Sequence, residues 1–304
     1  MRLSRSIPVL ASVGLLTLAL AGCGDDAGGD PGGAAADGKI AVVASTNVWG
    51  SVAQAVGGDA VSVESLINDA SGDPHAHPDK PEDAIALAGA DVVVYNGGGY
   101  DDFFTKLVDG TGTEAEQVDA FTISGYADGE NEHVWYDLPT VRKVADKIAD
   151  ALGAIDAGQK SRFADNAASF GGRLDALTDT AEQIGKASPG AKVVATEPVA
   201  HYLLDAAGVT DATSTEFSEA IEEETDPPVA VVAETTELIS DKQVAALVNN
   251  AQTETAVTNS LADAASKAGV PVVDVTETLP QGVTDYVEWM TEQLEALSGA
   301  LSKA

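Results

Sequence analysis

The chain has 304 residues, which allows one large or two medium domains, and 44% of them are hydrophobic, enough to bury a core. Sixteen Lys and Arg stand against 49 Asp and Glu, for a formal net charge of −33. We therefore expect no nucleic-acid partner, because binding to phosphates requires a basic surface. The charge itself indicates a well-solvated exported protein and specifies no site.

The N-terminus is typical of a targeting segment. Two arginines precede an apolar stretch over 7–20 that is too short to span a bilayer comfortably. The tetrapeptide LAGC follows and resembles a bacterial lipobox, and its Cys23 is the only cysteine, so no intramolecular disulfide can form. We predict a signal peptide over 1–22, a lipid on Cys23 that anchors the protein to the outside of the cell membrane, and a flexible tether over 23–38.

Short apolar strands alternate with helices between residues 39 and 156. We expect strands over 39–44, 60–67, 91–95 and 117–123, and helices over 46–56, 82–88, 100–108 and 138–152. This alternation predicts a parallel sheet with both faces covered. The glycine run after the third strand lacks the spacing of a phosphate-binding loop, so we discount a nucleotide site.

One uninterrupted helical pattern runs over 157–186. Its apolar residues recur at alternating spacings of four and three, and they are Phe163, Ala167, Phe170, Leu174, Leu177, Ala181 and Ile184. The pair Gly171-Gly172 is a weak point where a bend could form. We assign 157–187 to a helix that links two lobes; the alternative is an ordinary long surface helix of a single domain.

The second half, 188–304, repeats the alternation of strands and helices without an internal sequence repeat. We expect strands over 192–196, 243–249 and 270–273, helices over 199–207, 254–268 and 285–301, and an acidic loop over 219–226. The segment 228–239 fits a strand or a helix. The predicted fold is α/β, with two (βα) lobes, 39–156 and 188–304, whose parallel sheets are joined by one long linking helix.

Two of the four histidines and two carboxylates are predicted at strand ends. His75 and His133 lie in loops that leave strands, and Glu197 and Asp274 each follow a strand directly. A single histidine is more often a surface or core residue, but open α/β sheets bind ligands at the carboxyl edge of their strands. Two imidazoles and two carboxylates that converge there suit a divalent first-row metal.

Four local motifs stand out: DPH at 73–75 with prolines at 78 and 81, HVW at 133–135, TE at 196–197 with Tyr202, and VPVVD at 270–274. Through them the chain resembles the zinc/manganese-receptor family of ABC-transporter solute-binding proteins (cluster A-I), over nearly all of 39–304. The resemblance implies two lobes joined by a long helix and metal ligands at His75, His133, Glu197 and Asp274.

The chain also departs from the family pattern. It has Asn131-Glu132 where the family usually has Asp-Pro, and it lacks the long His-rich loop of many zinc receptors. The third ligand is glutamate in many manganese receptors, as Glu197 is here, and histidine in many zinc receptors. His201 could compete as a ligand, and His77 is a candidate accessory ligand, although a solvated loop residue is the commoner case.

Four protein ligands leave little room for a water or substrate on the metal, so we expect no enzyme. We expect capture of Mn²⁺ or Zn²⁺ as transported ligand, with Fe²⁺ also suited, and delivery to an ABC permease by a monomer. Two carboxylates favour manganese slightly. The alternatives are a binding protein for a siderophore-type metal chelate, which needs an aromatic or basic cleft, and an adhesin-type surface lipoprotein with vestigial ligands.

The ligand set predicts a pH-dependent affinity. Imidazoles and carboxylates bind metals in their deprotonated forms, so the affinity for Zn²⁺ or Mn²⁺ should fall as the pH drops below about 6. Calorimetric titrations between pH 5 and 8 measure this dependence. An affinity that stays constant down to pH 5 contradicts the predicted ligands.

Overall fold

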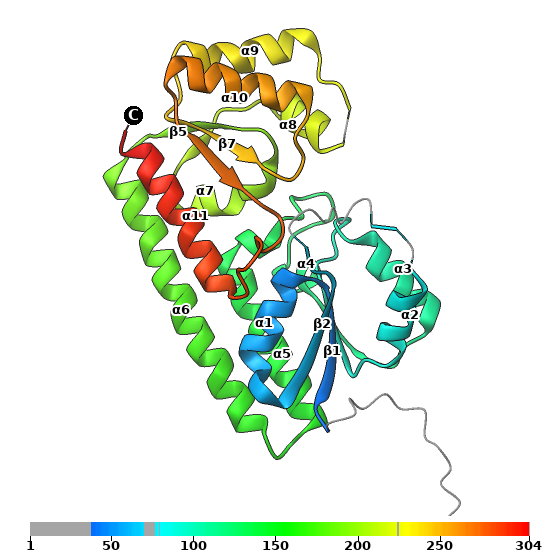
Figure 1. Ribbon diagram of the computed structural model, residues 1–304. Coiled ribbons are helices and arrows are strands. Elements are labelled where there is room, and N and C mark those ends of the chain that lie inside the picture. Colours follow the sequence, from blue (N-terminus) through cyan, green and yellow to red (C-terminus); the bar gives the residue numbers. More distant parts are fainter. Residues whose placement is uncertain (1–37, 70–76, 79, 224, 304) are drawn as a thin grey trace, which may run out of the picture. The chain divides into compact units, whose positions relative to one another are not determined.

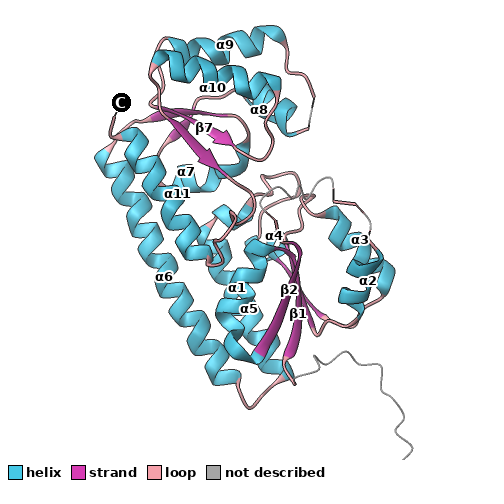
Figure 2. Ribbon diagram, in the orientation of Figure 1, coloured by secondary structure: helices cyan, strands magenta, loops and turns pink. Residues whose placement is uncertain are grey.

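The computed structural model describes residues 38–69, 77–78, 80–223 and 225–303. In these residues strands and helices alternate and form two four-stranded sheets, one in each half of the chain (Figure 1 and Figure 2). The neighbouring strands of both sheets pair in parallel. The predicted α/β class with parallel sheets is confirmed.

The first sheet has the strand order β2-β1-β3-β4. Its strands are β1 (Ile40–Thr46), β2 (Val61–Ile67), β3 (Val92–Tyr95) and β4 (Glu116–Asp119), and its helices are α1 (Asn47–Gly57), α2 (Pro81–Ala88), α3 (Asp102–Thr111), α4 (Ala120–Ser124) and α5 (Leu138–Ile155). Successive residues of β3 pack into different hydrophobic clusters: Val92 and Val94 join α1 and α5, whereas Val93 joins α2 and α3. Helices thus cover both faces, as continuous apolar strands require.

The second sheet has the order β6-β5-β7-β8, which repeats the arrangement of the first sheet. Its strands are β5 (Lys192–Ala195), β6 (Thr210–Asp211), β7 (Ala246–Asn250) and β8 (Val272–Val275), and its helices are α7 (His201–Ala206), α8 (Thr215–Glu222), α9 (Val229–Ser240), α10 (Ala256–Ala268) and α11 (Tyr286–Leu301). The described residues also form short 3₁₀ turns: η1 (Gly58–Ala60) and η2 (Val134–Tyr136) in the first half and η3 (Pro198–Ala200) in the second. The two halves therefore share a topology that the sequence does not repeat.

The long helix α6 (Lys160–Ala187) lies between the two sheets in the chain and continues through Gly171 and Gly172. All seven predicted stripe residues are buried in it. The helix packs against α1 and α5 of the first half and against α7 and α11 of the second (Figure 1). The predicted linking helix is confirmed.

Three segments have a different or more definite type of secondary structure than expected, besides smaller shifts at element ends. The strand expected over 117–123 ends at Asp119, because this side chain accepts the backbone N–H of Thr122 at 2.9 Å and caps the short helix α4. The acidic loop expected over 219–226 begins instead as helix α8, which buries Phe217 and Ile221 at helical spacing. The undecided segment 228–239 is helix α9, with buried residues every fourth position.

A common core joins the two sheets. Helix α11, at the end of the second half, packs against α1 and α6, and Tyr286 Oη donates a hydrogen bond of 2.6 Å to the carbonyl oxygen of Trp135. The predicted lobe boundaries at 156/157 and 187/188 remain a prediction. The predicted signal peptide, Cys23 and the tether up to residue 37 lie outside the described residues. Within the described residues, no helix is long and apolar enough to cross a bilayer.

Two glycines of α6 should respond oppositely to alanine. A Cβ at Gly185 would lie 2.3 Å from the carbonyl oxygen of Ala207, just after α7, whereas a Cβ at Gly172 meets nothing within 4 Å. We expect Gly185→Ala to lower the free energy of unfolding by about 1–3 kcal/mol through this overlap. Gly172→Ala should raise it by up to about 1 kcal/mol through helix propensity. Urea unfolding of both variants measures the difference, and equal shifts contradict close packing of α6 on α7.

Candidate metal-binding site

His133 occupies a buried position between α4 and η2. Its side chain is 1% exposed, and its ring centroid lies 5.0 Å from that of Trp135 and 6.0 Å from that of Tyr100. The loop that carries it is tied to the end of β3, because Asn96 Nδ2 donates a 2.8 Å hydrogen bond to the carbonyl oxygen of Glu132. The ring is therefore fixed by packing on its faces and by the preceding backbone.

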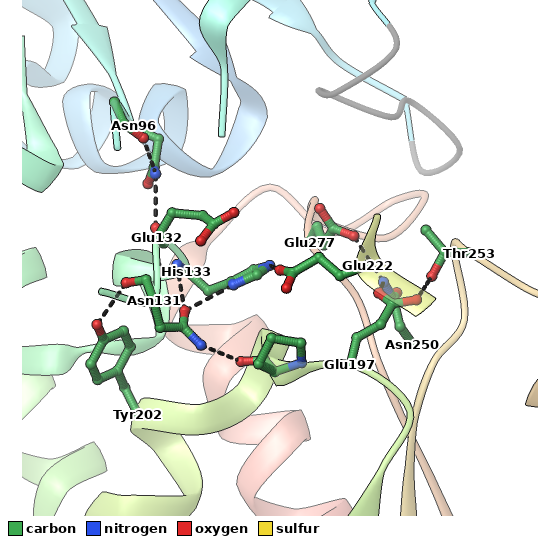
Figure 3. A network of polar contacts seen from close by, with 12 residues as sticks. Asn96, Asn131, Glu132, His133, Glu197, Tyr202, Glu222, Asn250, Thr253 and Glu277 are labelled. Atoms are coloured by element: carbon green, nitrogen blue, oxygen red, sulfur yellow. Dashed lines mark hydrogen bonds and ion pairs between the residues drawn. The ribbon is translucent and has the colours of Figure 1, made fainter. Parts of the chain in front are cut away.

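Asn131 determines which nitrogen of His133 carries the hydrogen (Figure 3). Asn131 Oδ1 accepts the backbone N–H of His133 at 2.8 Å, and Asn131 Nδ2 donates to the carbonyl oxygen of Pro198 at 2.9 Å. Each of these backbone groups has only one role, so the orientation of the amide is determined. His133 Nδ1, 2.9 Å from the same Oδ1, must then donate, and in the neutral ring Nε2 carries the lone pair that can bind a metal.

The same loop is held from the second half of the chain. Tyr202 Oη, on α7, donates a 2.6 Å hydrogen bond to the carbonyl oxygen of Asn131. The Tyr202 ring stacks on Tyr126, with centroids 5.1 Å apart and planes inclined by 12°. His133 thus belongs to the first half but depends on residues of the second for its position.

Two buried glutamates, Glu197 and Glu277, come together at the carboxyl ends of the second sheet. Each is 5% exposed, and each follows a strand, β5 and β8 respectively. Asn250 Nδ2, at the end of β7, donates to Glu197 Oε2 at 2.5 Å and to Glu277 Oε1 at 2.8 Å. Thr253 Oγ1 donates to the other oxygen of Glu197. In the sheet β7 lies between β5 and β8, so Asn250 at its end bridges the two carboxylates that follow the strands on either side.

The His133 segment contacts the segment that carries Glu277. Tyr136 Oη, in η2, donates a 2.8 Å hydrogen bond to the carbonyl oxygen of Thr276. Figure 3 shows the His133 ring pointing toward the side where the glutamates of the second half gather. The structure therefore brings His133 and Glu197, both predicted from the sequence, into one polar region with Glu277.

Two further carboxylates, Glu132 and Glu222, complete this region. Glu222 Oε1 lies 3.5 Å from His133 Nε2, and potential ligand atoms of Glu132, His133 and Glu222 all lie within 4.8 Å of one another. Burial, together with the negative charges of Glu132, Glu197 and Glu277, raises the pKa of Glu222 to about 8. Carboxylate oxygens and an imidazole nitrogen that gather in this way are donor atoms suited to a divalent cation.

Asp274 does not join this region. It lies within β8, its side chain is exposed, and Asn249 Nδ2 donates to its Oδ1 at 3.1 Å. Its neighbours Val273 and Val275 point into the core instead. His75, the remaining predicted ligand, lies outside the described residues.

Sequence reasoning missed Glu277 and Glu222, although signals existed for both. In the edge strand β8, strict alternation of Val273 and Val275 as buried residues assigns Asp274 to the solvent side. For Glu222, the apolar pair Phe217 and Ile221 at helical spacing marks a helix that a loop assignment overlooks.

The two other histidines lie elsewhere. His77 Nε2 lies 2.8 Å from Asp83 Oδ2, and its ring packs on Phe103, so it is neither an evident ligand nor a solvated loop residue. His201 begins α7, is 46% exposed, and has Asp205 at 3.6 Å. It also lines a surface cavity of about 590 Å³ beside Asn131.

Comparisons with known proteins agree on one family. The family model of the periplasmic zinc-uptake complex component A (ZnuA) matches residues 42–300. The chain is 30% identical over 194 residues to the metal ABC transporter substrate-binding lipoprotein FimA of Streptococcus parasanguinis, covering 58% of this chain and 62% of FimA. It is 29% identical over 191 residues to the manganese ABC transporter substrate-binding lipoprotein PsaA of Streptococcus anginosus, covering 57% and 61%. The chain thus spans about three-fifths of the length of these curated relatives.

A solved structure shares the fold over a longer stretch. The periplasmic zinc-binding protein TroA from Treponema pallidum superposes with a TM-score of 0.74, covering 87% of this chain and 99% of TroA. The sequence identity is 18%. At this identity the likeness shows the common fold of two parallel sheets and a long linking helix.

The network around Asn131 predicts the hydrogen position on His133. In the metal-free protein, two-dimensional ¹H–¹⁵N NMR should show the Nδ1–H form of the His133 ring. Asn131→Ala removes the acceptor, so the Nε2–H form should appear and the affinity for Zn²⁺ should fall about 10–100-fold. Tyr202→Phe is the control, because it removes a bond to the Asn131 carbonyl and leaves the acceptor in place. An unchanged ring spectrum in Asn131→Ala contradicts the assignment.

Proposed function

The chain belongs to the family of periplasmic zinc-uptake complex component A proteins, and we propose that it captures a divalent transition-metal ion outside the cytoplasm and delivers it to an ABC permease. His133 of the first half faces the side where Glu197 and Glu277 of the second half gather (Figure 3), and this arrangement supports the proposal most directly. The names of FimA and PsaA, both substrate-binding lipoproteins of metal ABC transporters, agree with it.

We propose His133 Nε2, Glu197 and Glu277 as metal ligands, with His75 as the fourth. Glu277 replaces Asp274 in this set, because Glu277 is buried beside Glu197 whereas Asp274 is exposed and paired with Asn249. Asn250 holds the two carboxylates in place and leaves each with acceptor capacity for a cation.

The donor set suits Mn²⁺ and Zn²⁺, and Fe²⁺ also fits mixed imidazole and carboxylate ligation. PsaA is named for manganese and TroA for zinc, so both metals occur among similar proteins. Carboxylates are harder ligands than imidazole and can bind through both oxygens, which favours Mn²⁺. Zn²⁺ exceeds Mn²⁺ in general affinity, so only transport in cells identifies the physiological cargo.

The proposal includes a receptor role rather than catalysis, and attachment to the membrane through a lipid on Cys23. A metal held by four protein ligands has little room for a reacting water or substrate. The ligands come from both halves of the chain, so release requires one half to withdraw its ligands. We propose that the permease causes this separation and that the receptor acts as a monomer.

Metal stoichiometry tests the function. The chain without its signal peptide, stripped of metal and equilibrated with Mn²⁺ or Zn²⁺, should hold about one ion per chain by mass spectrometry. Glu277→Gln removes a direct ligand, so the affinity should fall by more than the roughly 10–100-fold that loss of a supporting hydrogen bond costs.

Asp274→Asn is the matched control, because it changes the charge by the same amount three residues away in an exposed position. It should leave the affinity unchanged. The opposite result, with Asp274→Asn defective and Glu277→Gln normal, overturns the ligand assignment. Failure of the unaltered chain to bind stoichiometric metal overturns the proposed function.

A further inference from the structure

The carboxylates around His133 form two layers that differ in burial. Glu197 and Glu277 are 5% exposed, whereas the side chain of Glu222 is 20% exposed and Glu132 is half-buried. Figure 3 shows the His133 ring directed at Glu222, with Glu132 above the ring. Glu132 and Glu222 are therefore the more exposed, outer pair, and Glu197 and Glu277 are the buried, inner pair.

The backbone of both outer residues, Glu132 and Glu222, is held in place by packing or hydrogen bonds. Glu222 ends α8, whose Phe217 and Ile221 are 0% and 4% exposed. Three residues after Glu222, the backbone N–H of Thr225 donates a hydrogen bond of 2.8 Å to the carbonyl oxygen of Ala220 in α8. The backbone of Glu132 is held by Asn96. The proximity of Glu222 to His133 therefore follows from the packing of α8.

The spacing of the outer groups suits a metal ion. An ion that holds its ligands at about 2.1 Å separates neighbouring ligand atoms by about 3.0–3.4 Å. His133 Nε2 and Glu222 Oε1 are 3.5 Å apart, and one potential ligand atom from each of Glu132, His133 and Glu222 lies within 4.8 Å of the other two. Asn131 aims the Nε2 lone pair of the neutral ring at these oxygens, so three acceptor atoms face the same space.

We propose that Glu132, His133 and Glu222 form an outer metal-binding subsite, which receives a divalent cation before it passes to Glu197 and Glu277. His133 serves both subsites, so the ion exchanges the two outer carboxylates for the two inner ones without leaving the imidazole. This inference rests on the proposed capture function and adds the route by which the ion reaches the buried ligands. Two carboxylates and one imidazole provide a weak site suited to Mn²⁺.

Removing the inner ligands isolates the subsite. In the Glu197→Gln/Glu277→Gln variant, electron paramagnetic resonance of free Mn²⁺ should still show weak binding of about one ion per chain. Adding Glu222→Gln should abolish this residual binding. Adding Glu223→Gln instead should preserve it, because Glu223 is exposed and the substitution makes the same chemical change one residue away.

Association kinetics test the role of the subsite in the chain with intact inner ligands. Glu222→Gln should slow the association of Mn²⁺ by about 10-fold or more, because it replaces a carboxyl group that can bind Mn²⁺ with an amide that is a weaker ligand. Glu223→Gln should change the rate little. Glu132→Gln provides a second variant with the same expected loss, should Glu222→Gln disturb the packing of α8.

The outcomes separate this inference from the proposed function. If the unaltered chain binds one metal but the Glu197→Gln/Glu277→Gln variant binds none, the outer subsite is overturned and the capture function stands. Equal residual binding with and without Glu222→Gln also overturns it. If the unaltered chain binds no metal, both proposals fail.

Discussion

The burial of several like-charged carboxylates around one imidazole is the constraint on which this site depends. Burying a carboxylate costs free energy unless hydrogen bonds or an opposite charge compensate it. Hydrogen bonds from Asn250 and Thr253 offset part of the cost of burying Glu197, and a second hydrogen bond from Asn250 does the same for Glu277. Burial and the neighbouring carboxylates raise the pKa of Glu222 to about 8, so ionising this group is costly in the metal-free protein. A divalent cation bound among these carboxylates would offset their charges.

The scaffold keeps these charges together because both halves share one core. Helix α6 packs on helices of both halves, and α11 returns from the second half to pack on α1 (Figure 1). Two tyrosine hydroxyls, of Tyr286 and Tyr136, bind backbone carbonyls across the same boundary. Like charges that would otherwise push the halves apart are therefore held by apolar packing and by neutral hydrogen bonds.

Most of the fold could be predicted from the sequence because its main helices and strands are segments with a clear hydrophobic pattern. The stripe of α6 repeats over many turns, and the buried strands of both sheets read as unbroken apolar runs. Short elements could not be predicted as well: α4 depends on a single capping side chain, Asp119, and α8 on one apolar pair. Tertiary packing decides such segments, not local preference.

The site was harder to predict than the fold, since ligands from separate strands leave no local spacing to read. His133 and Glu197, which the structure brings into one polar region (Figure 3), are predicted as ligands from motifs that follow predicted strands. Asp274 is predicted as a ligand because it ends the VPVVD motif and directly follows the strand expected over 270–273. The strand continues through Val275, so the loop and its buried carboxylate begin later. A shift of two residues at a strand end exchanges an exposed acid for a buried one.

Glu222 illustrates how a residue that violates several local preferences can indicate function. It is an acid in the last position of a helix, where the helix dipole disfavours negative charge. It is also largely buried, and four other glutamates act on it electrostatically. Each feature alone destabilises the metal-free protein. Together they make sense if the residue's stabilising partner is a cation that the protein binds and later releases, because the same repulsion that costs stability in the empty state strengthens the attraction for the arriving ion.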